Sequence, residues 1–116
     1  MKIYVAQQNY HIGNFTLNRD KMIQAVEDGR KAGADLIVFS ELSVCGYPPR
    51  DFLEFEDFMQ QTEKTIQGIA QHSHGIGIIV GAPTPNPQPE GKNLLNSALL
   101  LYNGNIQGIV SKSLLP

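Results

Sequence analysis

Cysteine, charge and long apolar runs are scarce in this chain of 116 residues, and each scarcity excludes a class of protein. The one cysteine, Cys45, has no partner in the chain for a disulfide, which fits a reducing compartment. No apolar run approaches the roughly 18 residues that span a membrane. The first residues also lack the three-part pattern of a secretion signal. These absences predict a cytoplasmic protein with no membrane partner.

The charged residues are few and nearly balanced, with nine Lys and Arg against eleven Asp and Glu and a formal net charge of −2. The longest basic run is the pair Arg30 and Lys31, so no nucleic-acid partner is predicted. A length of 116 residues allows one domain or part of one.

Apolar periodicity predicts strands that alternate with helices. The expected order is strand 2–8, helix 17–32, strand 35–41, helix 55–70 and strand 76–81. Asn14 or Thr16 suits the N-cap of the first helix, and Gly33 suits the left-handed residue that follows its end. The short links around the first helix indicate a βαβ unit with parallel, buried strands.

The rest of the chain contains prolines and a turn signal. Residues 83–91 include four prolines, each without a backbone donor, so an exposed irregular connection is expected there. Asn103-Gly104 separates apolar runs at 96–102 and 105–112, and such a pair is the strongest short-range signal of a β-hairpin. The fold class is therefore α/β, with antiparallel strands at one edge. Two helices leave the apolar strands short of cover, so the chain is expected to be part of a larger domain.

A carboxylate at the end of a buried strand is the first candidate for chemistry. Ligand sites of α/β sheets lie at the carboxyl ends of strands, and Glu41 follows an apolar strand. A partly buried carboxylate binds its proton more tightly, which suits a general base near neutral pH. Glu41 could equally cap a loop or pair with Arg50, and its position alone does not decide between these roles.

Lys112, at the end of the last predicted strand, is the second candidate. Its ammonium could stabilise the oxyanion of a tetrahedral intermediate, or it could be a solvated lysine that guards an edge strand. Cys45 follows Glu41 by only four residues, without a strand end of its own, and is interpreted as a buried thiol. His72 and His74 lack a third ligand at a suggestive spacing, so no metal site is predicted.

These residues also carry a resemblance to a known family. Segment 35–51, which contains Glu41, resembles the surroundings of the catalytic glutamate in the nitrilase (carbon-nitrogen hydrolase) superfamily. Its continuation from Gly46 through Tyr47 to Asp51 is similar to that in the glutaminase domains of glutamine-dependent NAD synthetases. Segments 5–9, 79–83 and 112–116 agree in the same order, so the resemblance spans the whole chain.

The resemblance implies a four-layer α-β-β-α sandwich. Residues 1–116 would form its N-terminal half, a partial domain that ends before the cysteine nucleophile. By the same resemblance, Glu41 is the base that activates the thiol, Lys112 stabilises the tetrahedral intermediate, and Tyr47 lies near the substrate pocket.

The resemblance also implies substrates and partners. The substrate would be glutamine, and the ammonia released would amidate deamido-NAD at the expense of ATP in a separate synthetase domain. No ATP-binding or deamido-NAD-binding residue is expected in this segment, so no cofactor is predicted for it. A homo-oligomer is expected.

One residue departs from the family pattern, because Ser40 stands where the family usually has proline. The loss of the ring would loosen the strand tip without removing the chemistry. Since no nucleophile is expected within it, the isolated chain is predicted to hydrolyse no glutamine. Two alternatives stay open. One is a stand-alone amidase, nitrilase or carbamoylase, although the segment Gly46-Tyr47-Pro48-Pro49 weighs against it. The other is a non-catalytic module that pairs with itself or with a partner through its open sheet face.

Overall fold

The computed structural model describes residues 1–6, 14–40, 43–44, 52–85 and 94–113. Its elements are β1 (Ile3–Val5), α1 (Phe15–Lys31), β2 (Leu36–Val38), α2 (Phe52–Ala70), β3 (Gly77–Pro85), β4 (Leu94–Tyr102) and β5 (Asn105–Ser113). The strands form one sheet in the order β1-β2-β3-β4-β5. The pairs β1-β2 and β2-β3 are parallel, and β3-β4 and β4-β5 are antiparallel. The predicted α/β class and element order are confirmed.

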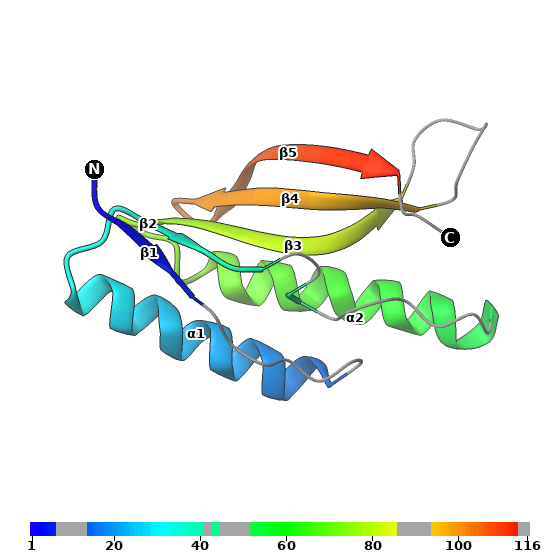
Figure 1. Ribbon diagram of the computed structural model, residues 1–116. Coiled ribbons are helices and arrows are strands. Elements are labelled where there is room, and N and C mark those ends of the chain that lie inside the picture. The colour runs from blue at the N-terminus through cyan, green and yellow to red at the C-terminus, as the bar shows by residue number, and fades with distance from the viewer. Residues whose placement is uncertain (7–13, 41–42, 45–51, 86–93, 114–116) are drawn as a thin grey trace.

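The two helices lie against the same face of the sheet, so the described part of the chain has two layers (Figure 1). On that face Ile37, Ile78 and Val80 are fully buried against apolar side chains of α1 and α2. On the opposite face Val38 and Ile79 are only partly buried, and Val5 of β1 and Val110 of β5 are 63% and 77% exposed. Within the described residues, the expectation that two helices leave the sheet short of cover is confirmed for one face. Neither described helix is long and apolar enough to cross a membrane.

The ends of α1 and the β4-β5 turn follow their sequence signals. The side chain of Asn14 accepts a hydrogen bond from the Leu17 N–H at 3.1 Å and is the N-cap. Gly33 has a φ of 79° directly after the C-cap residue. Asn103 and Gly104 have φ values of 51° and 81°, as a two-residue hairpin turn requires. All three predictions are confirmed.

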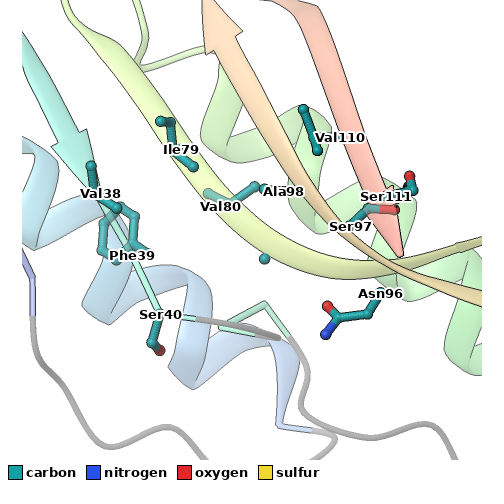
Figure 2. A pocket seen from close by; sticks show the side chains of 11 residues that line it. Val38, Phe39, Ser40, Ile79, Val80, Asn96, Ser97, Ala98, Val110 and Ser111 are labelled. Carbon is teal, nitrogen blue, oxygen red and sulfur yellow. Dashed lines mark hydrogen bonds between the residues drawn. The ribbon is translucent and has the colours of Figure 1, made fainter. Parts of the chain in front are cut away.

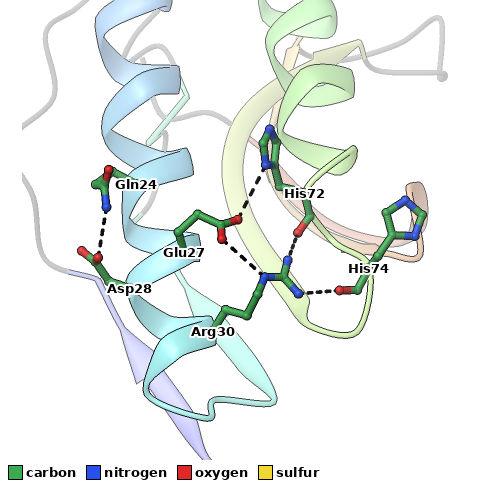
Figure 3. A network of polar contacts seen from close by, with 6 residues as sticks. All are labelled: Gln24, Glu27, Asp28, Arg30, His72 and His74. Carbon is green, nitrogen blue, oxygen red and sulfur yellow. Dashed lines mark hydrogen bonds and ion pairs between the residues drawn. The ribbon is translucent and has the colours of Figure 1, made fainter.

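A network of polar contacts joins the end of α1 to the turn that leads into β3 (Figure 3). The Arg30 guanidinium donates to the backbone carbonyls of His72 and His74. Glu27 pairs with Arg30 at 3.7 Å and with His72 Nδ1 at 3.8 Å. The N–H of His72 donates to the Ile69 carbonyl, so this histidine lies just after the C-terminal end of α2. The contacts fix the point at which β3 enters the sheet.

Strand β3 continues to Pro85, so the prediction of an irregular segment is wrong for its first three residues. Pro83 and Pro85 pair with β4 in regular register. The N–H of Gly81 points away from β4, toward the Ser43 hydroxyl, and residues two and four positions later share that orientation. The prolines therefore lack donors only on the side of β3 that the short strand β2 does not reach. No described strand pairs with β3 on that side at the two prolines, and proline is tolerated at such an edge.

Candidate active site

The structure describes the neighbours of the predicted catalytic residues more fully than the residues themselves. Glu41, Cys45 and Tyr47 lie outside the described residues. Lys112 lies in β5, where its backbone is paired with Asn96 of β4. Its side chain is also outside the description. The geometry of the site is therefore built from the residues that flank Glu41 and Lys112.

A pocket of about 370 Å³ lies on the sheet and is lined by residues 38–40, 79–81, 96–98 and 110–111 (Figure 2). Ser40, which precedes Glu41, lines one side of it, and Ser111, which precedes Lys112, lines another. Two residues chosen separately from the sequence thus have immediate neighbours at one pocket. The lining is mainly apolar, and Asn96 contributes an amide that is 7% exposed.

The sheet order determines how far apart the two sides of the pocket are. β2 and β5 are separated by β3 and β4, which amounts to three strand spacings or about 14 Å between backbones. A glutamate on one side and a lysine on the other have side chains long enough to approach a small molecule between them. The separation fits a site that holds a substrate and does not fit a direct backbone contact.

The chain leaves the β2-β3 ladder directly before Glu41. β2 ends at Val38, although the predicted strand ran to residue 41, and the N–H of Phe39 makes one further bond to the Ile79 carbonyl at 2.9 Å. The Ser40 carbonyl then accepts a hydrogen bond from the Ser43 N–H at 3.2 Å. This bond joins the residues on either side of positions 41 and 42, which lie outside the described residues. Among the described residues, the strand prediction is wrong for residues 35, 39 and 40.

A row of three hydroxyls, two of which belong to pocket-lining residues, crosses β3, β4 and β5. Ser97 Oγ lies 2.6 Å from Thr84 Oγ1 and 2.7 Å from Ser111 Oγ. The row ties β5 to the two preceding strands one residue before Lys112. No single segment of the sequence predicts it, because the three residues meet only through the strand register. Among the described residues no cluster of His, Cys, Asp and Glu could hold a metal ion.

Comparison with known proteins adds a family. The carbon-nitrogen hydrolase family matches residues 2–116. The glutamine-dependent NAD(+) synthetase of Synechocystis sp. is 40% identical over 98% of this chain and 21% of its own length. That of Thermotoga maritima is 32% identical over 100% of this chain and 20% of its own length. The chain spans about a fifth of the length of the curated relatives it matches.

Solved structures share the fold. The glutamine-dependent NAD+ synthetase of Acinetobacter baumannii, determined in complex with ADP, has a TM-score of 0.74 and 32% identity, over 98% of this chain and 21% of that one. The synthetase of Cytophaga hutchinsonii has a TM-score of 0.83 and 21% identity, over 98% and 19%. A Nesterenkonia amidase of the nitrilase superfamily has a TM-score of 0.76 and 23% identity, over 100% and 44%. The last two likenesses are of fold alone.

Proposed function

Because this chain belongs to the carbon-nitrogen hydrolase family, we propose that it supplies part of the glutaminase site of a glutamine-dependent NAD synthetase. The observation that carries the proposal is the shared pocket, since the residues before Glu41 and Lys112 line it from opposite sides. Its volume of about 370 Å³ lies in the range of small-molecule sites. The choice of glutamine follows the curated relatives, which match at up to 40% identity. The amidase likeness, at 23% identity, concerns the fold and favours no other substrate.

In the proposed reaction, Glu41 accepts the proton of a cysteine thiol that lies outside these 116 residues, and the thiolate attacks the amide carbon of glutamine. Lys112 stabilises the negative charge that develops on the amide oxygen. The carbon–nitrogen bond breaks, the proton on Glu41 passes to the leaving nitrogen, and ammonia departs from a thioester. Water then gives a proton to Glu41 and attacks the thioester, which releases glutamate. The proton returns to the thiolate, and Tyr47 lies near the bound substrate.

The remaining parts of the proposal concern the whole protein. ATP and deamido-NAD would bind to a synthetase domain outside this segment, where the ammonia amidates deamido-NAD. The exposed sheet face that carries Val5 and Val110 would be covered by the second half of the family's sandwich. The segment alone would hydrolyse no glutamine, and the whole protein would be a cytoplasmic homo-oligomer.

A two-substrate comparison on the full-length gene product tests this proposal. NAD formation from deamido-NAD and ATP is measured with glutamine and, separately, with ammonium chloride as the nitrogen source. Glu41→Gln and Lys112→Met are expected to lower the glutamine-driven rate by a factor of about 10² to 10⁴, the usual contribution of such groups, and to leave the ammonium-driven rate unchanged. Glu63→Gln, on the exposed face of α2, is the matched control and is expected to change neither rate.

Two results would contradict the proposal. The first is a wild-type protein that releases no ammonia from glutamine, and the second is a Glu41→Gln variant within tenfold of the wild-type rate. Rapid hydrolysis of short aliphatic amides without NAD formation would favour the stand-alone amidase. Ammonia release by residues 1–116 alone would show that the nucleophile lies within them.

A further inference from the structure

A buried amide on α1 contacts the chain at Val44, three residues after Glu41 in the sequence. Asn18 is fully buried on the stripe of α1 that also contains Met22 and Val26, where an apolar side chain would be expected. A buried amide costs free energy unless it is hydrogen-bonded, and asparagine is a weak helix former. The Asn18 Nδ2 donates to the Val44 carbonyl at 3.3 Å. The contact accounts for a polar residue at this core position.

The same short segment is also held by β3. The N–H of Val44 donates to the Gly81 carbonyl at 3.0 Å, and the Gly81 N–H donates to the Ser43 hydroxyl at 3.1 Å. Ser43 and Val44 are 1% and 0% exposed. Residues 43–44 are therefore fixed from two sides, by a helix side chain and by both backbone groups of a pocket-lining glycine.

The number of residues between successive bonds differs between β3 and the chain that faces it. Along β3 the bonded positions advance by two residues, from Ile79 to Gly81, while the facing chain advances by five, from Phe39 to Val44. The facing chain thus accommodates three more residues than a regular ladder would. The bond from the Ser43 N–H to the Ser40 carbonyl lies within this interval. In the sequence, Glu41 falls between these two residues.

We infer that Asn18 is a positioning residue for Glu41, because it holds the chain at Val44, three residues downstream of Glu41 in the sequence. Phe39 is held on the upstream side through its bond to β3, and the Asn18 amide bonds to the downstream side from α1. The assignment rests on the proposed function, because it is the base Glu41 that would be misplaced. A general base shifted by about 1 Å loses up to about 10² in rate.

The test uses the full-length protein with Asn18→Leu, which keeps the volume and removes the donor. Its matched control is Met22→Leu, one turn later on the same buried stripe of α1. Ser43→Ala weakens the second anchor without touching the helix core. Three quantities are measured: glutaminase kcat and KM, the acid limb of the pH profile of kcat/KM, and hydrogen exchange of a peptide that covers residues 39–44. The rate of ammonium-driven NAD formation is recorded beside them as a check on the integrity of the whole protein.

Asn18→Leu is expected to lower kcat by about tenfold to a hundredfold with KM nearly unchanged, and to shift the acid limb, which reports the base of the free enzyme. Exchange of the 39–44 peptide is expected to accelerate by about tenfold, and ammonium-driven NAD formation is expected to stay at its wild-type rate. Ser43→Ala is expected to produce smaller changes in the same directions, and Met22→Leu none.

The inference is overturned if Asn18→Leu matches Met22→Leu in all three measurements. It is also overturned if exchange accelerates equally throughout α1 and β3 and the ammonium-driven rate falls in parallel, because the amide is then only structural. A wild-type protein without glutaminase activity refutes the proposed function alone. The exchange comparison still decides in that case whether Asn18 holds residues 43–44.

Discussion

Ser97 is the middle member of the row of three hydroxyls, and its replacement by alanine is expected to loosen β5 by about 1.5 kcal/mol. Its hydroxyl contacts Thr84 on β3 and Ser111 on β5, and its side chain is 3% exposed. The substitution removes both hydrogen bonds at once. Because Ser111 precedes Lys112, a looser β5 would also move the proposed lysine of the site.

The two bonds are expected to contribute unequally. A typical intramolecular hydrogen bond contributes about 0.5–1.5 kcal/mol net, and the loss is largest when the remaining partner is buried and cannot bond to water. Thr84 is half-buried, so its lost bond should cost about 1 kcal/mol, whereas the exposed Ser111 can bond to water and should cost about 0.5 kcal/mol. The expected order of destabilisation is therefore Ser97→Ala, then Thr84→Val, then Ser111→Ala.

Native-state hydrogen exchange of peptides from β4 and β5 measures these values in the intact protein, since protection there reports the free energy of local opening. Ser97→Ala should accelerate exchange by about tenfold, Thr84→Val by about fivefold and Ser111→Ala by about twofold. Ala98→Ser, on an exposed neighbour of Ser97, is the control and should leave exchange unchanged. An acceleration by Ser97→Ala of less than twofold, or an effect of Ser111→Ala as large as that of Ser97→Ala, would refute this reasoning.

Four further substitutions test the fold that carries the pocket. Gly104→Ala should destabilise the hairpin by about 2 kcal/mol, because φ is 81° and a Cβ would meet the His74 ring at 3.3 Å. Gly33→Ala, with a φ of 79° and open space around it, should cost about 1 kcal/mol. Equal losses of stability in thermal unfolding would contradict the extra cost assigned to the contact with His74. Arg30→Lys should accelerate exchange after α2 by about threefold, since an ammonium lacks the fork that bridges two carbonyls, and unchanged exchange would deny that role. Ile37→Ala, at a fully buried position, should cost about 3 kcal/mol in denaturant unfolding, and a loss below 1 kcal/mol would place it outside the core.

The helices and the hairpin are predictable from the sequence because their signals are local. Asn14 and Gly33 satisfy the backbone groups at the two ends of α1 within three residues of each end. Asn103 and Gly104 both adopt positive φ, a requirement that few other residue pairs meet. None of these features depends on a distant strand, so a window of a few residues is sufficient.

The prolines of β3 show why the same approach fails at a sheet edge. Taken alone, Pro83 and Pro85 indicate a segment without regular structure. Their acceptability depends on which side of β3 their missing donors face and on whether a neighbouring strand extends that far. Both facts belong to the sheet, since Gly81 sets the phase and β2 ends too early to reach the prolines. A pattern within one strand contains neither fact.

The end of β2 is the most instructive difference, because it lies where the chemistry is proposed. A regular strand through Glu41 would place Ser40 beside Gly81 and use both backbone groups of that glycine in the ladder. Those groups bond instead to Ser43 and Val44, which follow Glu41 in the sequence. A departure from a local rule needs compensation elsewhere, and here the Asn18 amide provides it from 26 residues away. The apolar run before Glu41 therefore points to this carboxylate as a candidate, whereas the contact that holds residues 43–44 could be found only once α1 and β3 were placed beside them.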